Sequence, residues 1–335
     1  MKRLVLALFW LVPLAVLAAD PLTFSGQYRI ETPEQVISNL QGKAALAFRL
    51  RLSSYNLQDF TDGVNDGEAR TPERVDRQAR GAATALDDIN PDIAVFQELE
   101  NGDVLRKINS KLSRPFPVGY ITSFHARGGQ DQKLNIGLLS RIPVSGVREL
   151  DFEHLEGAGR PPRGLLSFIV NLGDNRRLLV YGVHLKSNWG DERKNRFQRY
   201  HALKFLRADA DAVVAQNPRF AWEILVMGDM NMDPASPGFN ETKTLEPLKG
   251  WTDLWKGRPL AERMTLPTRY GDPSQEFPPI TFDRFYASPE LQTEPWVTQP
   301  PQVLQRGVDT NISVVAGEND VHVSDHYPVY IDLLR

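Results

Sequence analysis

The amino-acid sequence predicts an α/β fold, and two observations carry that prediction. A helical pattern beginning at Thr71-Pro72 leads into the short apolar run 92–96, and a helix followed by a buried strand is the unit of α/β folds. Further apolar runs of strand length recur along the chain, and several end in a polar or charged residue. No internal repeat, low-complexity tract or linker divides residues 20–335, so we expect them to form a single domain.

The composition is that of an ordinary globular protein. Hydrophobic residues make up 41% of the chain and charged residues 24%, and the formal net charge is -3. This net charge argues against wholesale binding to polyanions, although it allows a local basic groove. The chain has no cysteine, which excludes disulfides, a thiol nucleophile and a lipidated cysteine.

The first residues have the pattern of a secretory signal peptide. Met1-Lys2-Arg3 precede an apolar run that extends from Leu4 to Ala19 and ends in small residues. This run is shorter than the roughly 20 residues of a membrane span. We therefore expect cleavage after residues 1–19, export to the periplasm or the medium, and no integral membrane association afterwards. The alternative is an uncleaved inner-membrane anchor.

The first half of the predicted domain contains two strands with a helix between them. Residues 45–56 alternate as a strand that ends in Asn56, a residue that could equally cap a turn. Thr71 is the expected N-cap of the helix that follows, and Asn90-Pro91 ends it. The strand 92–96 then leads into Gln97-Glu98, which places the Glu98 carboxylate where it can point into a cleft and hold a divalent ion.

The middle of the chain predicts three strands and a long helix. Residues 134–140, 163–171 and 177–186 have strand character, and Gly173-Asp174-Asn175 predicts a hairpin turn between the last two. The second arm of this hairpin finishes near His184. The helix expected over 191–215 carries Arg193, Lys194, Arg196 and Arg199 on its polar side. These charges fit a solvated face or a phosphate-binding surface.

The last part of the chain places further polar groups at strand ends. A buried strand over 223–227 leads into Gly228, whose sharp turn would let Asp229 and Asn231 face the same space, unless this is an ordinary polar turn. Residues 240–302 predict long loops and short helices, except for a strand over 280–287 that buries Asp283. A buried carboxylate needs a partner, and we predict His326, which precedes the closing strand.

Together these strand-end groups have the chemistry for metal-assisted attack of water on a phosphoester. They are Asn56, Glu98, His184, Asp229, Asn231, Asp283, Asp325 and His326. The chain lacks a Gly-x-Ser-x-Gly elbow, a His-Glu-x-x-His zinc helix and a Gly-rich loop ending in Lys-Ser/Thr.

The ordered motifs that carry these groups resemble the endonuclease/exonuclease/phosphatase superfamily, over residues 45–334. The motifs are Tyr55-Asn56-Leu57, Gln97-Glu98, His184-Leu185-Lys186-Ser187, Gly228-Asp229-Met230-Asn231, Phe282-Asp283-Arg284 and Ser324-Asp325-His326-Tyr327-Pro328. This group contains deoxyribonuclease I, exonuclease III, abasic-site endonucleases, neutral sphingomyelinases and inositol polyphosphate 5-phosphatases. The resemblance implies a four-layer αββα sandwich, in which two mixed β-sheets pack face to face with helices outside, and a cleft at one sheet edge.

The resemblance also implies a role for each matching residue. Glu98 would be the main ligand of Mg2+ or Mn2+, with Ca2+ left open, and Asn56 and Asp325 would lie nearby. Asp229, oriented through Asn231, would position or deprotonate the attacking water. His326, paired with Asp283, would stabilise charge on the scissile phosphate, and His184 would contact that phosphate from the other side.

The sequence departs from the family pattern at one place. Several branches carry a Tyr or Glu on the strand that matches 134–140, where this chain offers Asn135 or Asp131. The role of His184 is therefore open.

The leading hypothesis is an exported, monomeric nuclease that acts on DNA, with RNA as a second substrate. Its expected phosphate and substrate contacts are Asn56, Asn135, Arg160, Arg163, Lys186, Asn231 and the 193–199 helix. One alternative keeps the chemistry but changes the substrate to a phospholipid or a small phosphate ester. A lipid enzyme would need an exposed apolar hairpin, and the region of Trp251, Trp255 and Trp296 is where it would lie. The other alternative is a binding protein on a retired catalytic scaffold, which has no physical need for paired buried charges.

Overall fold

The computed structural model describes residues 22–39, 48–66, 70–123, 135–240, 242–267, 278–310 and 316–335. The predicted signal peptide, together with Asp131 and Leu134, lies outside these ranges. No helix in the described part of the chain has the length and apolar character needed to cross a membrane.

Two mixed β-sheets form the centre of the molecule. In the described residues the first sheet has seven strands in the order β1-β7-β8-β9-β10-β12-β11. Its strands are β1 (Arg29–Glu31), β7 (Val144–Asp151), β8 (Leu165–Gly173), β9 (Arg176–His184), β10 (Ala221–Asp229), β12 (Asp283–Ala287) and β11 (Thr252–Asp253). β9 and β10 are parallel, and their neighbours β8 and β12 run antiparallel to them.

The second sheet, also counted over the described residues, has eight strands. Seven follow the order β13-β15-β3-β4-β6-β5-β2, and β14 pairs with β15. The strands are β13 (Val297–Thr298), β15 (Val329–Leu334), β3 (Arg49–Phe60), β4 (Ile93–Leu99), β6 (Asn135–Ser140), β5 (Val118–Ile121), β2 (Glu34–Ser38) and β14 (Gln302–Val303). β3 and β4 are parallel, whereas β15 and β6 run antiparallel to them.

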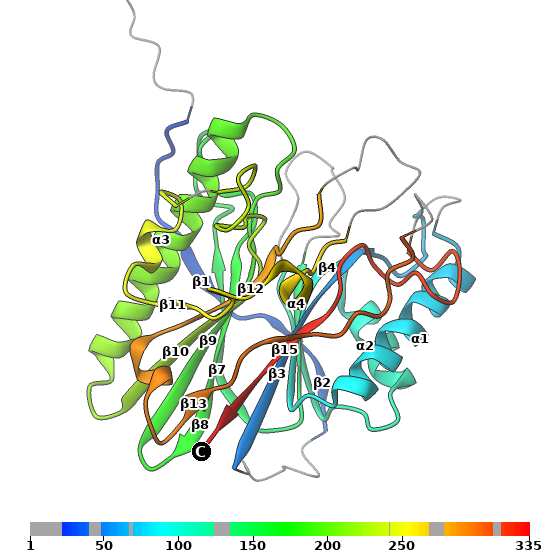
Figure 1. Ribbon diagram of the computed structural model, residues 1–335, viewed down its shortest axis with the longest axis horizontal. Helices are drawn as coiled ribbons and strands as arrows, with labels where there is room; N and C mark the ends of the chain where they lie inside the picture. Colours follow the sequence, from blue (N-terminus) through cyan, green and yellow to red (C-terminus); the bar gives the residue numbers. More distant parts are fainter. Residues whose placement is uncertain are drawn as a thin grey trace, which may run out of the picture.

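Helices cover the outer face of each sheet (Figure 1). The α-helices are α1 (Pro72–Ile89), α2 (Gly102–Lys111), α3 (Glu192–Gln216) and α4 (Leu260–Arg263), with short 3-10 turns at Glu246–Leu248 and Pro289–Gln292. α1 and α2 lie on the side of the second sheet, and α3 lies on the side of the first. The arrangement confirms the expected αββα sandwich.

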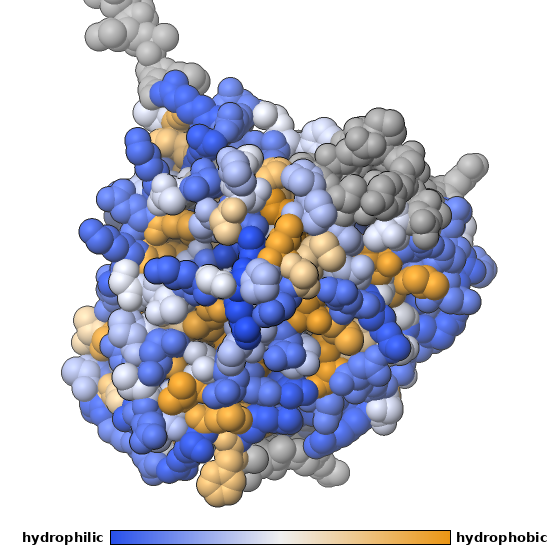
Figure 2. Space-filling view, viewed as in Figure 1, coloured by the Kyte–Doolittle hydropathy of each residue, from blue (hydrophilic) through white to orange (hydrophobic). Residues whose placement is uncertain are grey.

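Three clusters of buried apolar residues hold the sheets and helices together. One core cluster lies between the sheets and includes Leu52, Val95, Phe168 and Leu225. A second joins α1 and α2 to the second sheet, and a third joins α3 to the first sheet. The face shown in Figure 2 is mixed, with apolar residues in separate patches among hydrophilic ones.

Local signals predicted several elements closely. Thr71 caps α1 by accepting a hydrogen bond from the Arg74 N–H at 3.4 Å, and Asn90 ends that helix with a φ of 49°. The β8–β9 turn has positive φ at Asp174 (46°) and Asn175 (62°), as a type I′ hairpin turn requires.

Other expectations needed correction. Asn56 lies inside β3, which continues to Phe60, and β9 ends at His184, so Lys186 belongs to the following loop. The strand predicted over 280–287 begins only at Asp283, and the elements that were not predicted are β1, β2, β5, β7, β11, β13, β14 and α2. β7 gives a weak alternating pattern because Gly146 has a φ of 54° and the pairing with β8 shifts register between Ser145 and Arg148.

Candidate active site

A distorted strand end directs Glu98 toward the other predicted site residues. The pairing of β4 shifts register between Phe96 and Leu99 on its β6 side, and a matching shift occurs on its β3 side. Glu98 itself has a φ of 64°, which a non-glycine residue rarely adopts. Such bulges re-aim a side chain, and backbone strain of this kind concentrates at functional sites.

Asn56 links the two central carboxylates. Its Nδ2 donates to Glu98 Oε1 at 3.0 Å and to Asp229 Oδ2 at 3.1 Å. The other oxygen of the Glu98 carboxylate accepts the Asp59 N–H at 2.8 Å, where Asp59 also has a positive φ of 48°. The ends of the two parallel strand pairs, β3–β4 and β9–β10, therefore meet at one point between the sheets.

Gly228 allows β10 to turn where Asp229 enters the site. Its φ is 137°, and a Cβ at this position would lie 2.1 Å from the carbonyl oxygen of Val183. Asn231 then donates from its backbone N–H to Asp229 Oδ1 at 2.8 Å and from Nδ2 to Oδ2 at 3.1 Å. Asn231 therefore holds the Asp229 carboxylate in place, as we expected.

His184 lies opposite Asp229 in the parallel β9–β10 pair. Its Nε2 is 3.5 Å from Glu98 Oε1 and 3.6 Å from Asp229 Oδ2. Burial lowers the pKa of His184 well below its usual value, and the nearby charges of Arg163, His326 and Lys186 lower it further. The imidazole is therefore neutral at physiological pH, with a lone pair available on one ring nitrogen.

His326 has the opposite character. Its Nδ1 lies 2.7 Å from Oδ2 of the fully buried Asp283, which confirms the predicted pair. Burial alone would lower the pKa of His326, but the charge and hydrogen bond of Asp283, with the charges of Asp325 and Asp229, raise it well above its usual value. The site thus combines one neutral and one cationic imidazole.

Ser324 brings the Asp325-His326 segment against β3. The Ser324 hydroxyl donates to the backbone oxygen of Asn56 at 2.7 Å and accepts the His326 N–H at 3.1 Å. Asp325 follows in the chain, and its charge contributes to the raised pKa of Glu98. Sequence reasoning did not assign a role to Ser324, although its place in the Ser-Asp-His motif was a signal.

The environment of the site raises the pKa values of both central carboxylates. Burial raises the pKa of Glu98 to about 7, and the charges of Asp59 and Asp325 add to this effect. Burial also raises the pKa of Asp229 to about 6, where His326 opposes the shift and Asp283 adds to it. Buried carboxylates of this kind need compensating positive charge.

Glu98, His184 and Asp229 together could provide that charge by holding a metal ion. Each offers a ligand atom, and these atoms lie within 4.8 Å of one another. Two carboxylates and a neutral imidazole suit Mn2+, and the carboxylate oxygens suit Mg2+. The donor set therefore fits a divalent cation. Glu98 belongs both to this group and to the predicted metal set of Glu98, Asn56 and Asp325, and metal binding by Asn56 and Asp325 stays a prediction.

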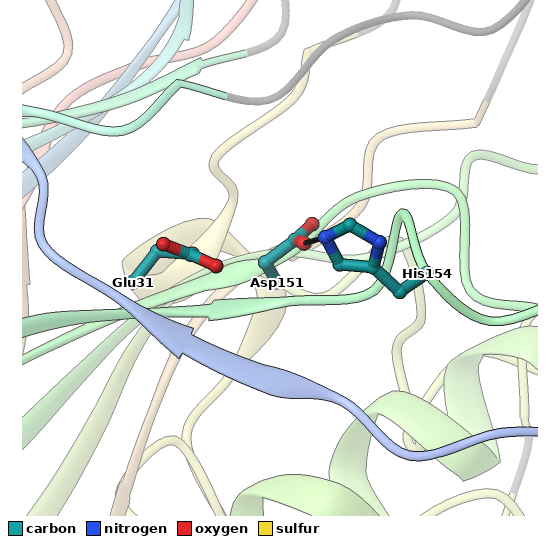
Figure 3. A group of neighbouring side chains, drawn as sticks. All are labelled: Glu31, Asp151 and His154. Carbon is teal, nitrogen blue, oxygen red and sulfur yellow. Dashed lines mark ion pairs between the residues drawn. The ribbon is translucent and has the colours of Figure 1, made fainter.

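Two other acidic groups in the described residues are less suited to a metal. Figure 3 shows Glu31, Asp151 and His154, where the Asp151 carboxylate points at the imidazole ring. His154 Nε2 lies 3.4 Å from Asp151 Oδ2 and 2.9 Å from Arg29 Nη1. The Arg29 guanidinium therefore already contacts the nitrogen that a metal ion would need.

The other group stabilises the loop after β3. Asp62, Asp66 and Glu100 each accept a backbone N–H, from Val64, Gly63 and Asp62 respectively. These oxygens are therefore used within the loop itself, which is the ordinary role of Asp in polar turns.

Basic side chains line the β9 side of the site. Arg163 Nη1 donates to the backbone oxygen of Leu185 at 2.6 Å, and the charges of Glu98 and Asp229 act on its guanidinium. Lys186 Nζ donates to Ser187 Oγ at 2.9 Å, and burial, with the charges of Arg163 and Arg199, lowers the pKa of Lys186 to about 8.

The basic face of α3 needs one correction. Arg199 is 1% exposed, and its Nη1 donates to the backbone oxygen of Lys186 at 2.5 Å, so it supports the loop instead of facing solvent. Asn135 also has a partner that was not expected. Its Nδ2 donates to the Glu100 backbone oxygen at 2.8 Å, and its contact with substrate stays a prediction.

An ion-pair network that sequence reasoning missed lies beneath Asp283. Arg284 donates to Asp233 at 3.1 Å and to Asp253 at 2.5 Å, and Arg263 donates to Asp233 at 2.6 Å. Asp233 follows Asn231 by two positions, a spacing that could have marked it. The network holds the β10 loop against β12, which carries Asp283.

Comparison with solved structures finds proteins of the same fold. TDP2 from C. elegans is 19% identical, with a TM-score of 0.58, over 88% of this chain and 78% of that chain. D. rerio TDP2, complexed with a single-strand DNA product, is 18% identical, with a TM-score of 0.55, over 86% of this chain and 99% of that chain. Sphingomyelinase C from Streptomyces griseocarneus is 17% identical, with a TM-score of 0.58, over 85% of this chain and 99% of that chain.

Comparison with curated protein sequences gives no match. Comparison with protein families matches residues 40–326 to the Endonuclease/Exonuclease/phosphatase family, a group of hydrolases that act on phosphoester bonds. The matched range includes every strand-end group of the site, from Asn56 to His326. The chain belongs to the endonuclease/exonuclease/phosphatase family.

Proposed function

We propose that this protein is an exported, metal-dependent nuclease that hydrolyses DNA phosphodiester bonds, with RNA as a second substrate. The observation that carries the proposal is the contact of Asn56 with both Glu98 and Asp229, at 3.0 and 3.1 Å, beside the His326–Asp283 pair. These contacts support a site in which carboxylates would hold a cation, a base would activate water and a cationic imidazole would stabilise the phosphate.

The residues divide the chemistry between them. Glu98, with His184, would hold Mg2+ or Mn2+, and Asp325 adds negative charge beside them. The bound ion would polarise the scissile phosphate and offset its charge. Asp229, fixed by Asn231, accepts a proton from the water whose oxygen forms the new bond to phosphorus, as the bond to the leaving oxygen breaks.

The imidazole of His326 then stabilises the charge that develops on the phosphate oxygens. Its pairing with Asp283 keeps it protonated and fixes the orientation of the ring. Arg163 and Lys186 supply further positive charge for the phosphates that flank the scissile bond.

Two findings favour DNA as the substrate. The basic groups Arg163 and Lys186 lie beside the carboxylate site. A solved relative of the same fold was crystallised with a single-strand DNA product. The signal-peptide pattern of residues 1–19 supports export, and we expect the mature protein to be a monomer.

The second candidate is phospholipid or small phosphate-ester hydrolysis on the same scaffold. Its support is the similar fold of a sphingomyelinase C. The region of the three tryptophans does not form an exposed lipid-binding hairpin. Trp255 and Trp296 are each 1% exposed, and Trp251 packs against the core cluster beneath α3. The aromatic region therefore favours packing over membrane contact.

A substrate panel tests the proposal. The mature protein is incubated with plasmid, linear duplex, single-stranded DNA, RNA and sphingomyelin vesicles, in Mg2+, Mn2+, Ca2+ or EDTA. We expect DNA cleavage with Mg2+ or Mn2+ that stops in EDTA, falls steeply as salt rises and disappears in Asp229→Ala. Intact DNA under every metal, with release of phosphocholine from the vesicles, would establish the lipid alternative instead.

A further inference from the structure

An exposed tryptophan stands on the loop that joins β9 to α3. Trp189 is 63% exposed, whereas Trp222, Trp255 and Trp296 are 8%, 1% and 1% exposed. Single exposed aromatic residues are common on protein surfaces, so exposure alone assigns no function. Trp189 differs from such residues because hydrogen bonds fix its backbone and because its loop contacts the active site.

The loop holds Trp189 in a fixed place. The backbone oxygen of Trp189 accepts hydrogen bonds from Lys186 Nζ at 2.9 Å and from Asn195 Nδ2 at 3.0 Å. Gly190 follows with a φ of 95°, and Asp191 then caps α3 by accepting the Lys194 N–H at 2.7 Å. An aromatic ring whose backbone is anchored in this way loses little entropy when it binds a ligand.

The same loop is attached to the active site. Asn188 Nδ2 donates to the backbone oxygen of Asn231 at 3.0 Å, and Asn231 Nδ2 donates to the backbone oxygen of Leu185 at 3.1 Å. Asn231 also holds the Asp229 carboxylate. The position of Trp189 is therefore linked, through Asn188 and Asn231, to the carboxylate that would activate water.

The surroundings of Trp189 point to a nucleobase as its partner. Two cations lie on this loop, because Lys186 Nζ donates to the Trp189 backbone oxygen at 2.9 Å and Arg163 Nη1 donates to the Leu185 backbone oxygen at 2.6 Å. Ser187, Asn188, Gly190 and Asp191 flank the indole in the chain, so the loop offers one ring and no apolar surface for a bilayer. An exposed aromatic ring beside cationic side chains is the arrangement that binds single-stranded nucleic acid, with the ring stacking on bases and the cations contacting phosphates.

We propose that Trp189 stacks on a nucleobase next to the scissile phosphate, and that it gives the enzyme a preference for strands with unpaired bases. This inference rests on the proposed nuclease function. Phosphate contacts alone would not distinguish a strand with bases from one without.

Steady-state kinetics on two strands of equal charge test the proposal. One substrate is a dT12 oligonucleotide, and the other is the same strand with every base replaced by an abasic residue. Trp189→Ala should raise KM on dT12 about 5- to 150-fold with little change in kcat, because stacking is worth about 1–3 kcal/mol per base. It should leave KM on the abasic strand unchanged, and Trp189→Phe should recover part of the loss on dT12.

Phe48→Ala is the matched control. Phe48 is 80% exposed but precedes β3 at the end opposite Asn56, so its removal should change neither substrate. Equal KM increases for Trp189→Ala on both strands, or no increase on either, would overturn the stacking role. Loss of sphingomyelin-vesicle hydrolysis without loss on dT12 would identify the indole as a membrane contact and would also overturn it.

Fluorescence in EDTA separates this proposal from the nuclease function. Titration with dT12 should quench the tryptophan emission of the wild type more than that of Trp189→Phe, whether or not the strand is cleaved. Equal quenching in the two proteins would refute stacking at Trp189. A wild type that shows the difference but cleaves no strand would refute the nuclease function and leave the stacking site standing.

Discussion

His326 Nδ1 lies 2.7 Å from Asp283 Oδ2, although 43 positions separate the two residues in the chain. Asp283 begins β12 in the first sheet, and His326 precedes β15 in the second, so the pair forms across the two sheets. The carboxylate keeps the neighbouring imidazole cationic despite its burial.

Asp283→Asn should remove that charge while it keeps the shape of the side chain. We expect kcat on DNA to fall roughly 10²- to 10⁴-fold, the range typical of lost acid–base or electrostatic assistance, with a small change in KM. Circular dichroism would show whether the fold is retained. Near-normal kcat in a folded variant would contradict the role given to this pair.

Glu98→Gln and Glu100→Gln form a matched pair of charge removals two positions apart. Glu98 faces the metal cluster, whereas Glu100 accepts the Asp62 N–H in the loop group. Titration of activity with Mn2+ should show a large loss of metal activation for Glu98→Gln and little loss for Glu100→Gln. A larger loss for Glu100→Gln than for Glu98→Gln would instead assign the metal to the group of Asp62, Asp66 and Glu100.

Lys186→Met should weaken DNA binding and make it less dependent on salt. Lys186 lies beside the site, and one lost phosphate contact lowers the slope of log K against log salt by about 1. The control Lys204→Met removes an exposed charge from α3 and should leave the slope unchanged. Equal slopes in the two variants would show that Lys186 does not contact phosphate.

Gly228→Ala should destabilise the protein and displace Asp229. A Cβ there would lie 2.1 Å from the Val183 oxygen, whereas a Cβ at Gly173, also at positive φ, meets nothing within 4 Å. We expect Gly228→Ala to lower the free energy of unfolding by about 3 kcal/mol and Gly173→Ala by about 1 kcal/mol. Urea unfolding measures both, and similar costs would disprove the steric argument.

Glu149→Gln should change how stability depends on pH. Burial raises the pKa of Glu149 from 4.5 to about 7, so the folded state retains a proton that the unfolded state releases between these pH values. Stability from this group is therefore present below about pH 4.5 and lost as pH rises through about 7. Glu149→Gln should flatten this decline by on the order of 1–3 kcal/mol in unfolding measured from pH 4.5 to 8. An unchanged profile would argue against a buried, protonated Glu149.

The sequence by itself determined the α/β character of the chain and the order of its polar strand ends. Apolar runs that stop at Glu98, His184 and Asp229 are local signals, because burial of a strand imposes its pattern on consecutive residues. The same is true of the caps of α1 and the β8–β9 turn. These features depend on neighbours in the chain, so they can be read without the fold.

Only the tertiary structure decided the protonation states of those groups and the directions of their side chains. The bulge that turns Glu98 inward arises from the pairing of β4 with both β3 and β6, and no local sequence pattern predicts it. Two imidazoles that look alike in the sequence differ in charge because burial keeps His184 neutral, whereas the paired carboxylate of Asp283 keeps His326 cationic. Burial and charge at each group are sums over residues distant in the chain, which only the packed sheets bring together.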